Sequence, residues 1–350
     1  MQDIKYLKSQ IDLRLEIEKD LGAPAHQSSE VWTFWCPFVQ EKTVGGFKVW
    51  ADRYKCFSCG EAGDVFDWRQ KIHDQTLIEA VNYYGGGTKL DGHELLKYTT
   101  ERAEQAAKEL EDKIALAQKA LSELREAQIW VKYHESLSKN QQARDLWTAR
   151  GVSEWWQDWW KLGYCESYSL WKRGDTDWEA WWKSPTISFP VWGHDWEVYN
   201  VKHRLLQEPP EGGKYIQEKK RVPQYPFITN PDIKKNKLLL LEGEIKAMVT
   251  FIVCDDIDLQ VAGIPGDQPS DECLKTFDDY DPIYVCLDPD AYEVKRDDSP
   301  VNKVIKRLGT DRTRVIWIPA KIDDAIIENK LNKNMIKRLM ESARRTNNVV

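Results

Sequence analysis

LLLLEGE, residues 238–244, is an apolar run that ends in acids. A second run of the same kind, IYVCLDPD, covers residues 283–290. Each β-prone apolar run predicts a buried parallel strand, and the acids at its carboxyl end then lie in the crevice where such sheets bind ligands. Carboxylates gathered there stay ionised together only when a cation balances them, and Mg²⁺ or Mn²⁺ is the natural choice. The pattern therefore predicts a metal site suited to phosphoryl or nucleotidyl transfer.

Three acidic motifs in this order resemble the TOPRIM domain of bacterial-type primases and topoisomerases: EGE at 242–244, DPD at 288–290 and KIDD at 321–324. The alternative interpretation, an ordinary α/β sheet with solvated acids at its strand ends, explains one such motif better than three. The resemblance implies catalytic roles for Glu242, Asp288 and Asp290. It implies that the magnesium site consists of Glu242, Asp288, Asp290, Asp323 and Asp324.

One position departs from the family pattern. Family members often carry an acid four residues after the glutamate, where this sequence has Lys246. A lysine there can hold a phosphate or form an ion pair with Asp288, and it would reduce the number of metal ions held. Glu244 is a candidate to compensate.

A second metal site is predicted near the amino terminus. Cys36 begins the run CPFV, and Cys56 and Cys59 form a Cys-x-x-Cys pair within YKCFSCG, residues 54–60. Cysteine pairs on short antiparallel strands are typical of a zinc ribbon. The run resembles the zinc-binding domain of bacterial and phage primases, which implies that these three cysteines bind Zn²⁺. The fourth ligand in that family is a histidine, and Val39 stands in its place.

The replaced histidine leaves three alternatives open. Another group completes the site, or zinc binds weakly, or the ribbon is stable without zinc. The candidates for a fourth ligand are His26, His73, Glu41 and a water molecule.

The rest of the chain extends the same resemblance. Residues 94 to about 138 are rich in Ala, Glu, Lys, Leu and Gln and contain no Pro or Gly, which predicts one or two long helices. The motifs that follow are similar to the lobe that precedes the TOPRIM domain in primases. The predicted fold is a multidomain α/β chain with a small zinc ribbon. Its parts are a primase-type zinc-ribbon domain (1–90), a helical spacer (91–145), a mixed α+β primase lobe (146–235) and a TOPRIM parallel sheet (236–345).

Basic residues complete the predicted site. The family's basic residues in the lobe correspond to Arg150, Arg204 and Lys214, which implies contacts with template phosphates and incoming nucleotides. Lys202 and Lys246 are further candidates for nucleic-acid or nucleotide binding.

The distribution of charge is uneven along the chain. Residues 201–240 carry nine Lys and Arg against four Asp and Glu, whereas residues 241–300 carry four against sixteen. A basic strip beside an acidic pocket suits a polyanion held near metal ions, although two solvated faces of opposite charge give the same counts. With a formal net charge of -7, the 350-residue chain as a whole is not a basic nucleic-acid binder.

The sequence also bears on the cellular compartment. It has no signal-peptide pattern and no apolar segment of about 18 residues. Its seven cysteines are an odd number and include one Cys-x-x-Cys pair, which favours metal binding over disulfides. We therefore expect a cytoplasmic protein of a bacterial host cell, without a membrane partner.

Together these features predict a DNA primase of phage or mobile-element type, a nucleotidyltransferase that makes short RNA primers on single-stranded DNA from ribonucleoside triphosphates. No P-loop motif is present, so we expect a separate replicative helicase or replisome protein as a partner. The alternative is a catalytically inactive, primase-derived protein that binds single-stranded DNA or a replisome component. A TOPRIM nuclease or topoisomerase is a weaker alternative, because the zinc ribbon and the lobe would then have no use.

Overall fold

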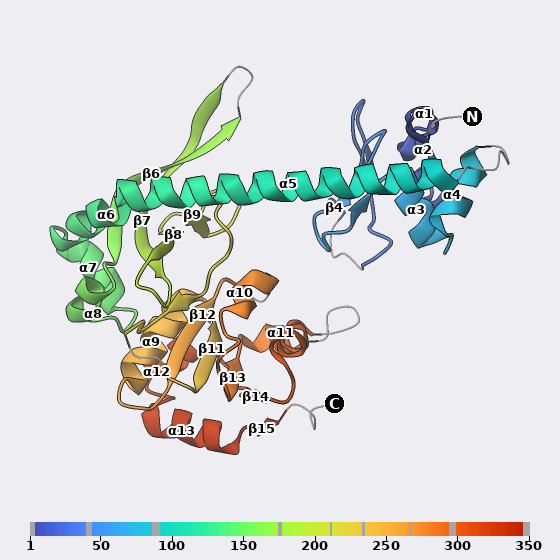
Figure 1. The fold of residues 1–350 in the computed structure, drawn as a ribbon. Coiled ribbons are helices and arrows are strands. Elements are labelled where there is room, and N and C mark those ends of the chain that lie inside the picture. The colour runs from blue at the N-terminus through green and yellow to red at the C-terminus, as the bar shows by residue number, and fades with distance from the viewer. Residues whose placement is uncertain are drawn as a thin grey trace. The chain divides into compact units, whose positions relative to one another are not determined.

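The structure is a computed structural model (Figure 1). It describes residues 4–39, 44–85, 92–173, 177–210, 212–232, 235–266, 268–293 and 299–345. The chain divides into two compact units, Met1–Asp112 and Lys113–Val350. This single division does not test the four predicted segments, whose limits stay a prediction. In the described ranges, none of the helices combines the length and the apolar character needed to cross a membrane.

The first unit contains a five-stranded antiparallel sheet whose strand order follows the sequence. Its strands are β1 (His26–Gln27), β2 (Trp32–Phe34), β3 (Phe47–Val49), β4 (Tyr54–Cys56) and β5 (Ala62–Gly63). The helices around it are α1 (Ile4–Ser9), α2 (Leu13–Leu21), α3 (Val65–Ile72) and α4 (Leu77–Tyr84). The core of this unit is aromatic: Phe47, Tyr54 and Trp68 are almost fully buried, with ring centroids 5.6 to 6.0 Å apart. Large rings bury much surface in a small sheet, so they stabilise it efficiently.

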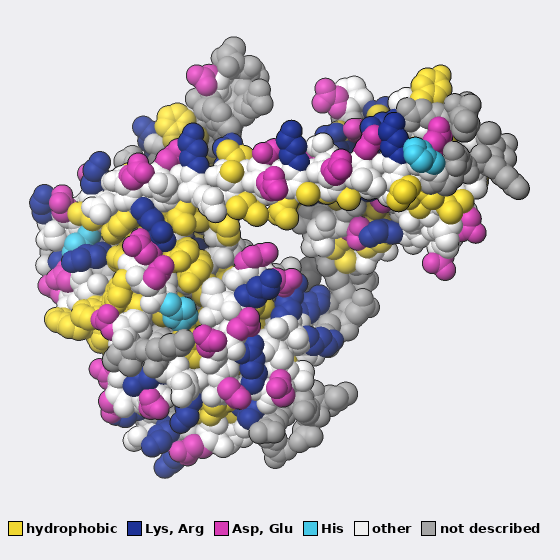
Figure 2. Space-filling model, viewed as in Figure 1, with side chains coloured by type: hydrophobic (Ala, Val, Ile, Leu, Met, Phe, Trp, Pro, Cys, Tyr) yellow, Lys and Arg dark blue, Asp and Glu magenta, His cyan; other side chains and the backbone are white. Residues whose placement is uncertain are grey.

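The predicted long helices are confirmed. They are α5 (Gly92–Ala127) and α6 (Ile129–Ser138), and the residue between them, Gln128, has a left-handed backbone with φ of 44°. A non-glycine residue in that conformation cannot continue a right-handed helix, so the chain turns there. Two short helices follow, α7 (Gln141–Thr148) and α8 (Glu154–Trp159). Trp155 and Trp159 stack with centroids 5.3 Å apart, and Figure 2 shows hydrophobic side chains gathered over this part of the second unit.

The second unit contains two sheets. The antiparallel sheet has the order β6 (Gly163–Arg173), β7 (Trp178–Trp192), β8 (Val198–Leu205) and β9 (Tyr215–Gln217). The other sheet has the order β10-β12-β11-β13-β14-β15, and its inner strands β12, β11, β13 and β14 are parallel. Its strands are β10 (Phe227–Ile228), β11 (Leu238–Glu242), β12 (Gln260–Ile264), β13 (Ile283–Cys286), β14 (Thr313–Val315) and β15 (Arg344–Arg345). The predicted fold class, a parallel α/β sheet with a mixed lobe and a small ribbon, is confirmed.

Helices cover both faces of the parallel sheet. Alternate residues of β11 point to opposite faces, and both faces of this strand are apolar. Leu239 and Leu241 belong to a core that also holds residues of α9, α12 and α13 and of the antiparallel sheet. Leu238 and Leu240 belong to a second core, with residues of α10 and α11. These helices are α9 (Glu244–Cys254), α10 (Asp271–Lys275), α11 (Pro300–Leu308), α12 (Ile322–Ile327) and α13 (Lys333–Ser342). The first core therefore joins the lobe and the parallel sheet into one body.

The turn after β11 depends on two glycines. Gly243 has φ of 92°, a conformation that side chains with a Cβ avoid, and it separates the end of β11 from the start of α9. A Cβ at Gly263 of β12 would lie 2.6 Å from the carbonyl oxygen of Gly243, so the neighbouring strand also requires glycine. The strand thus ends at Glu242, and Glu244 starts the helix.

Candidate active site

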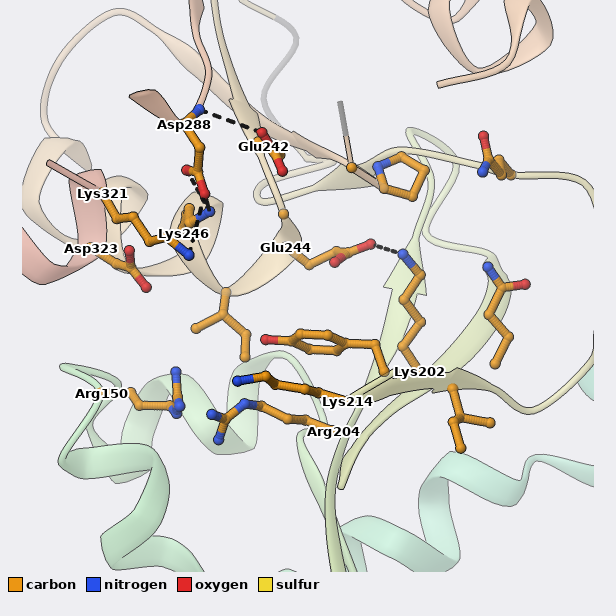
Figure 3. A pocket seen from close by; sticks show the side chains of 18 of the residues that line it. Arg150, Lys202, Arg204, Lys214, Glu242, Glu244, Lys246, Asp288, Lys321 and Asp323 are labelled. Atoms are coloured by element: carbon orange, nitrogen blue, oxygen red, sulfur yellow. Dashed lines mark hydrogen bonds and ion pairs between the residues drawn. The ribbon is translucent and has the colours of Figure 1, made fainter. Parts of the chain in front are cut away.

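A cavity of about 660 Å³ in the second unit collects most of the predicted site residues (Figure 3). It lies where the carboxyl ends of β11 and β13 face the antiparallel strands β8 and β9. Its charged lining residues are Arg150, Lys202, Arg204, Lys214, Glu242, Glu244, Lys246, Asp288, Lys321, Asp323 and Asp324. One predicted residue, Asp290, is not among the lining residues.

One wall of the cavity is acidic. Glu242 is the last residue of β11, and one of its carboxylate oxygens accepts a hydrogen bond from the backbone N–H of Asp288 at 3.4 Å. Asp323 and Asp324 lie in the first turn of α12. The Asp323 side chain is buried, and its Oδ1 atom has no hydrogen-bond partner among the residues that the structure describes. Burial raises the pKa of the Asp323 carboxyl, because it disfavours the charged form.

Asp290 lies apart from this wall for a local reason. The strand β13 ends at Cys286, and Pro289 begins a 3-10 helix, Pro289–Tyr292, in which Asp290 is exposed. Asp288 therefore lines the cavity without Asp290, although the resemblance implies that the two act as a metal-binding pair. A catalytic or metal-binding role for Asp290 stays a prediction.

Lys246 occupies the centre of the acidic wall. Its Nζ atom donates to both carboxylate oxygens of Asp288, each at 2.6 Å. The Nζ atom of Lys321 lies 3.5 Å from one of the same oxygens. Both partners of the main pair are largely buried, with 14% of the Lys246 side chain and 8% of the Asp288 side chain exposed. Two outcomes were expected for Lys246, a bound phosphate or an ion pair with Asp288, and the structure contains the ion pair. The contact of Lys321, the first residue of the KIDD motif, with Asp288 was not predicted from the sequence.

Lys202 is also engaged by an acid. It forms an ion pair with Glu244, and both residues are buried. Figure 3 shows the Glu244 side chain directed toward Lys202 rather than toward Glu242. The sequence presented Lys202 as a ligand for nucleic acid or nucleotide. In this structure its charge is balanced within the protein, so that role stays a prediction.

The opposite wall is basic and less well balanced. Arg150 follows α7, and Arg204 lies on β8 opposite Tyr215 of β9. Neither guanidinium group has a hydrogen bond or ion pair with any residue in the described part of the chain. Burial, and after it the positive charge of Arg204, lower the pKa of Arg150. Lys214 is half-exposed and pairs with Glu208 at 2.9 Å. This wall therefore offers two unsatisfied cationic forks to an anion.

Only some of the carboxylates in the acidic wall are available to bind a divalent cation. Carboxylate oxygens are the ligands that Mg²⁺ prefers, and Glu242, Asp323 and Asp324 offer them to the cavity. Asp288 does not, because both of its oxygens are engaged by Lys246. Within the described ranges, the cysteines of the first unit are the only group that places three potential ligand atoms within 4.8 Å of one another.

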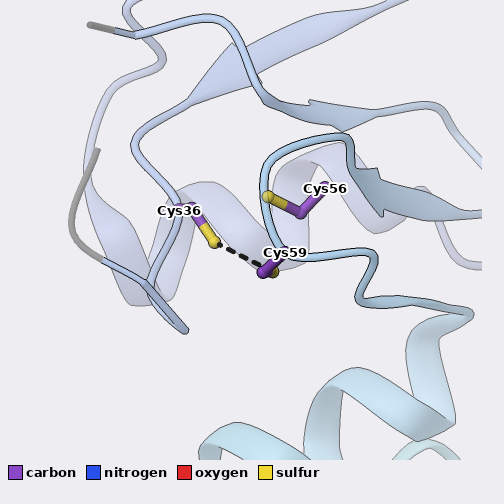
Figure 4. Close-up of side chains that lie close together, drawn as sticks. All are labelled: Cys36, Cys56 and Cys59. Carbon is purple, nitrogen blue, oxygen red and sulfur yellow. Dashed lines mark hydrogen bonds between the residues drawn. The ribbon is translucent and has the colours of Figure 1, made fainter. Parts of the chain in front are cut away.

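The cysteine group fits a zinc ion (Figure 4). Cys36 follows β2, Cys56 ends β4, and Cys59 lies in the next turn. The Sγ atoms of Cys36 and Cys59 are 3.8 Å apart. Four ligands in a tetrahedron with Zn–S bonds of about 2.3 Å have an S–S separation of about 3.8 Å. Burial opposes the Cys56 thiolate, but hydrogen bonds from Cys59 and Cys36 outweigh it and lower the pKa of Cys56.

The structure narrows the alternatives for a fourth zinc ligand. Neither His26 nor His73 belongs to the cysteine group, and His73 Nε2 instead lies 2.9 Å from a carboxylate oxygen of Asp20. Val39 is half-buried and packs against the apolar core of the first unit. Glu41, the other candidate, lies outside the described residues.

Comparison with known proteins gives matches for both units. Residues 1–97 match the model of the family described as CHC2 zinc finger. A stretch of 50 residues is 48% identical to a DNA primase of Clostridium acetobutylicum, and it covers 14% of this chain and 8% of that protein. The match thus spans only a small fraction of that relative's length.

Solved structures show the fold of the larger unit. A DnaG primase catalytic domain bound to ssDNA has a TM-score of 0.52 at 17% identity, with 66% of this chain and 83% of that chain covered. The primase catalytic core of E. coli has a TM-score of 0.50 at 17% identity, with coverages of 61% and 78%. At this identity the likeness shows a shared fold. The predicted resemblance to bacterial-type DNA primases is therefore confirmed, by the family model that matches residues 1–97 and by the fold of the larger unit.

Proposed function

We propose that this chain is a DNA primase of phage or mobile-element type, which joins ribonucleotides into short RNA primers on a single-stranded DNA template. One observation carries the proposal. Two guanidinium groups without ion pairs in the described part of the chain, Arg150 and Arg204, face an acidic wall across one cavity of about 660 Å³. A triphosphate needs cationic partners for its oxygens, and nucleotidyl transfer needs carboxylates nearby for a cation.

In the proposed reaction, the arginines orient the incoming nucleotide. Arg150 and Arg204 bind its triphosphate through their planar forks, and Lys214 binds a template phosphate as a point charge. The 3′-hydroxyl of the primer attacks the α-phosphate, a phosphodiester bond forms, and the bond between the α and β phosphates breaks with release of pyrophosphate. Glu242, at the end of β11, accepts the proton of the hydroxyl.

A divalent ion contributes charge neutralisation on the phosphates when it is bound. The residues that would hold it are Glu242, Asp323 and Asp324, which line the cavity. Asp288 supports this wall through its backbone contact with Glu242.

The template and the partner are part of the same proposal. The solved DnaG catalytic domain of similar fold is bound to ssDNA, which supports a DNA template for this chain. We further propose that a separate helicase or replisome protein delivers that template.

A second function is favoured by one observation. The bidentate contact of Lys246 with Asp288 removes a metal ligand from the acidic wall. A primase-derived protein that binds single-stranded DNA or a replisome component, without polymerising, would tolerate that loss.

A primer-synthesis assay separates the two functions. Purified full-length chain receives single-stranded DNA, four ribonucleotides and Mg²⁺ or Mn²⁺. Short products are expected from the parent and from the control Asp271→Ala, whose exposed side chain pairs with Arg307. Products are expected to be lost in Asp323→Ala and in the double variant Arg150→Ala/Arg204→Ala. Template binding without any product from the parent would instead establish the binding protein.

A further inference from the structure

Asp288 is a buried carboxylate that the protein itself neutralises. The ammonium group of Lys246 contacts both oxygens at 2.6 Å, and Lys321 lies 3.5 Å from one of them. Charged hydrogen bonds of this length in a buried place are strong, because little water competes for them. Lys246 also sits on α9, a helix with many buried apolar residues, so its position is supported by the core. The ammonium group of Lys246 thus occupies the position that a metal cation would take beside Asp288.

The charge of the whole cavity points the same way. Six basic and five acidic side chains line it, so the lining of the cavity carries a small positive charge. Such a lining repels an isolated divalent cation and attracts a polyphosphate. Replacing Lys246 by an acid would reverse the sign, because five basic residues would then face six acids.

Asp323 is a second buried acid of the cavity, and it would be stabilised by a cation. Its side chain is 8% exposed, it lines the cavity, and its Oδ1 atom has no hydrogen-bond partner in the described part of the chain. A buried carboxyl oxygen without a partner is costly, and a cation that enters with a ligand removes the cost. Asp324, the next residue, lines the same cavity.

We propose that Lys246 is a built-in cation that holds Asp288, so that the cavity takes up a divalent ion only together with a nucleoside triphosphate, and takes it at Asp323 rather than at Asp288. The inference rests on the proposed function for the identity of the nucleotide. The behaviour toward the metal ion alone follows from the charges, and it can be measured without any catalysis.

The test is a titration of the zinc-loaded full-length chain with Mn²⁺, in which electron paramagnetic resonance reports the free ion. Without nucleotide, the parent is expected to show only weak, unsaturable binding. With a non-hydrolysable ribonucleoside triphosphate, it is expected to bind one Mn²⁺ beyond what the nucleotide binds alone. The variant Lys246→Asp is expected to bind Mn²⁺ without nucleotide at least about tenfold more tightly than the parent, because an acid replaces a positive charge beside Asp288.

Matched variants separate this site from a general change in charge. Lys330→Asp makes the same substitution at a lysine that is exposed and pairs with Glu328, and it is expected to behave as the parent. Asp323→Asn is expected to lose the Mn²⁺ that enters with nucleotide. If circular dichroism shows that Lys246→Asp is unfolded, Lys246→Gln decides the question, with a smaller gain of the same sign.

Two results would overturn the inference: tight Mn²⁺ binding by the parent without nucleotide, or no gain in Lys246→Asp and Lys246→Gln over Lys330→Asp. Primer synthesis is scored separately on the same preparations. A parent that makes no primers but shows the expected Mn²⁺ pattern overturns the proposed function alone.

Discussion

Lys202 on β8 and Glu244 at the start of α9 form a buried ion pair that joins the antiparallel sheet to the parallel sheet. Their exposed fractions are 8% and 5%. Because both charges have left water, each depends on the other for compensation. The pair thus links the two walls of the cavity.

Breaking this pair is expected to destabilise the second unit strongly. Lys202→Met leaves Glu244 buried without its cation and should lower the free energy of unfolding by about 3–5 kcal/mol. The double variant Lys202→Met/Glu244→Gln should recover much of the loss, since no charge is then left unpaired. Urea unfolding followed by tryptophan fluorescence gives both values. The exposed ion pair of Lys330 with Glu328 provides the control: Lys330→Met should change the free energy of unfolding by at most about 1 kcal/mol. Equal losses in the single and double variants would contradict this account.

Removing one of the two facing arginines is expected to weaken nucleotide binding. Arg204→Ala deletes charge-assisted contacts with phosphate worth about 1.5–3 kcal/mol, so affinity for a ribonucleoside triphosphate should fall by roughly 10- to 150-fold. The stability of the ligand-free chain should not fall for electrostatic reasons, because the repulsion between Arg204 and Arg150 is relieved. Isothermal titration calorimetry measures the affinity. Lys337→Ala, at an exposed position on α13, is the control and should bind as the parent does.

Restoring a histidine to the zinc site is expected to strengthen it. Val39 stands where the family pattern has the fourth ligand, and valine has no atom that binds a metal. Val39→His should slow the transfer of zinc to a chelator by about tenfold or more, if the imidazole completes the tetrahedron. Val39→Ala is the matched control and should release zinc as the parent does. Equal release rates for all three proteins would mean that another group already fills the fourth position.

The pH dependence of stability should carry the signature of Asp323. Burial raises the pKa of this carboxyl above its ordinary value of 3.8, so the fold favours the protonated form. Its contribution to stability is therefore complete below pH 3.8 and is lost as the pH rises through the raised pKa. Asp323→Asn, which stays neutral, should melt at a higher temperature than the parent at pH 7, and the difference should vanish in acid. Melting curves without divalent ions test this, and a lower melting temperature for Asp323→Asn at pH 7 would contradict it.

Much of the fold could be predicted because its signals are local. The four leucines of β11 alternate between two apolar cores, and a buried strand is the conformation that such a run supports. Cys36, Cys56 and Cys59 could be identified as one group because the zinc-binding domain that this run resembles implies it, and in the structure their thiols lie together. The acids Glu242 and Asp288 were placed at one sheet edge for the same kind of reason: both follow parallel strands that are neighbours in the sheet.

Other features of the site depended on contacts that local signals do not contain. The resemblance implied a metal-binding role for both acids of the DPD motif, but Asp290 belongs to the 3-10 helix that begins at Pro289 and does not line the cavity. The EGE motif does not show where its strand ends, and the positive φ of Gly243 ends that strand at Glu242. Lys321 could have been noticed as the basic member of KIDD, although nothing in the motif assigns it to Asp288.

The buried strands, the helices and the acids at the strand ends could be predicted from the sequence, because each depends on residues a few positions apart. For Lys246 the sequence left two outcomes open, and the packed structure shows the ion pair with Asp288, 42 residues away. The pairing of Lys202 with Glu244, also 42 residues away, had no signal in the sequence. Which charged side chains pair depends on the distance between them and on their removal from water. The distance and the removal from water both follow from the packing of the lobe and the parallel sheet on one core.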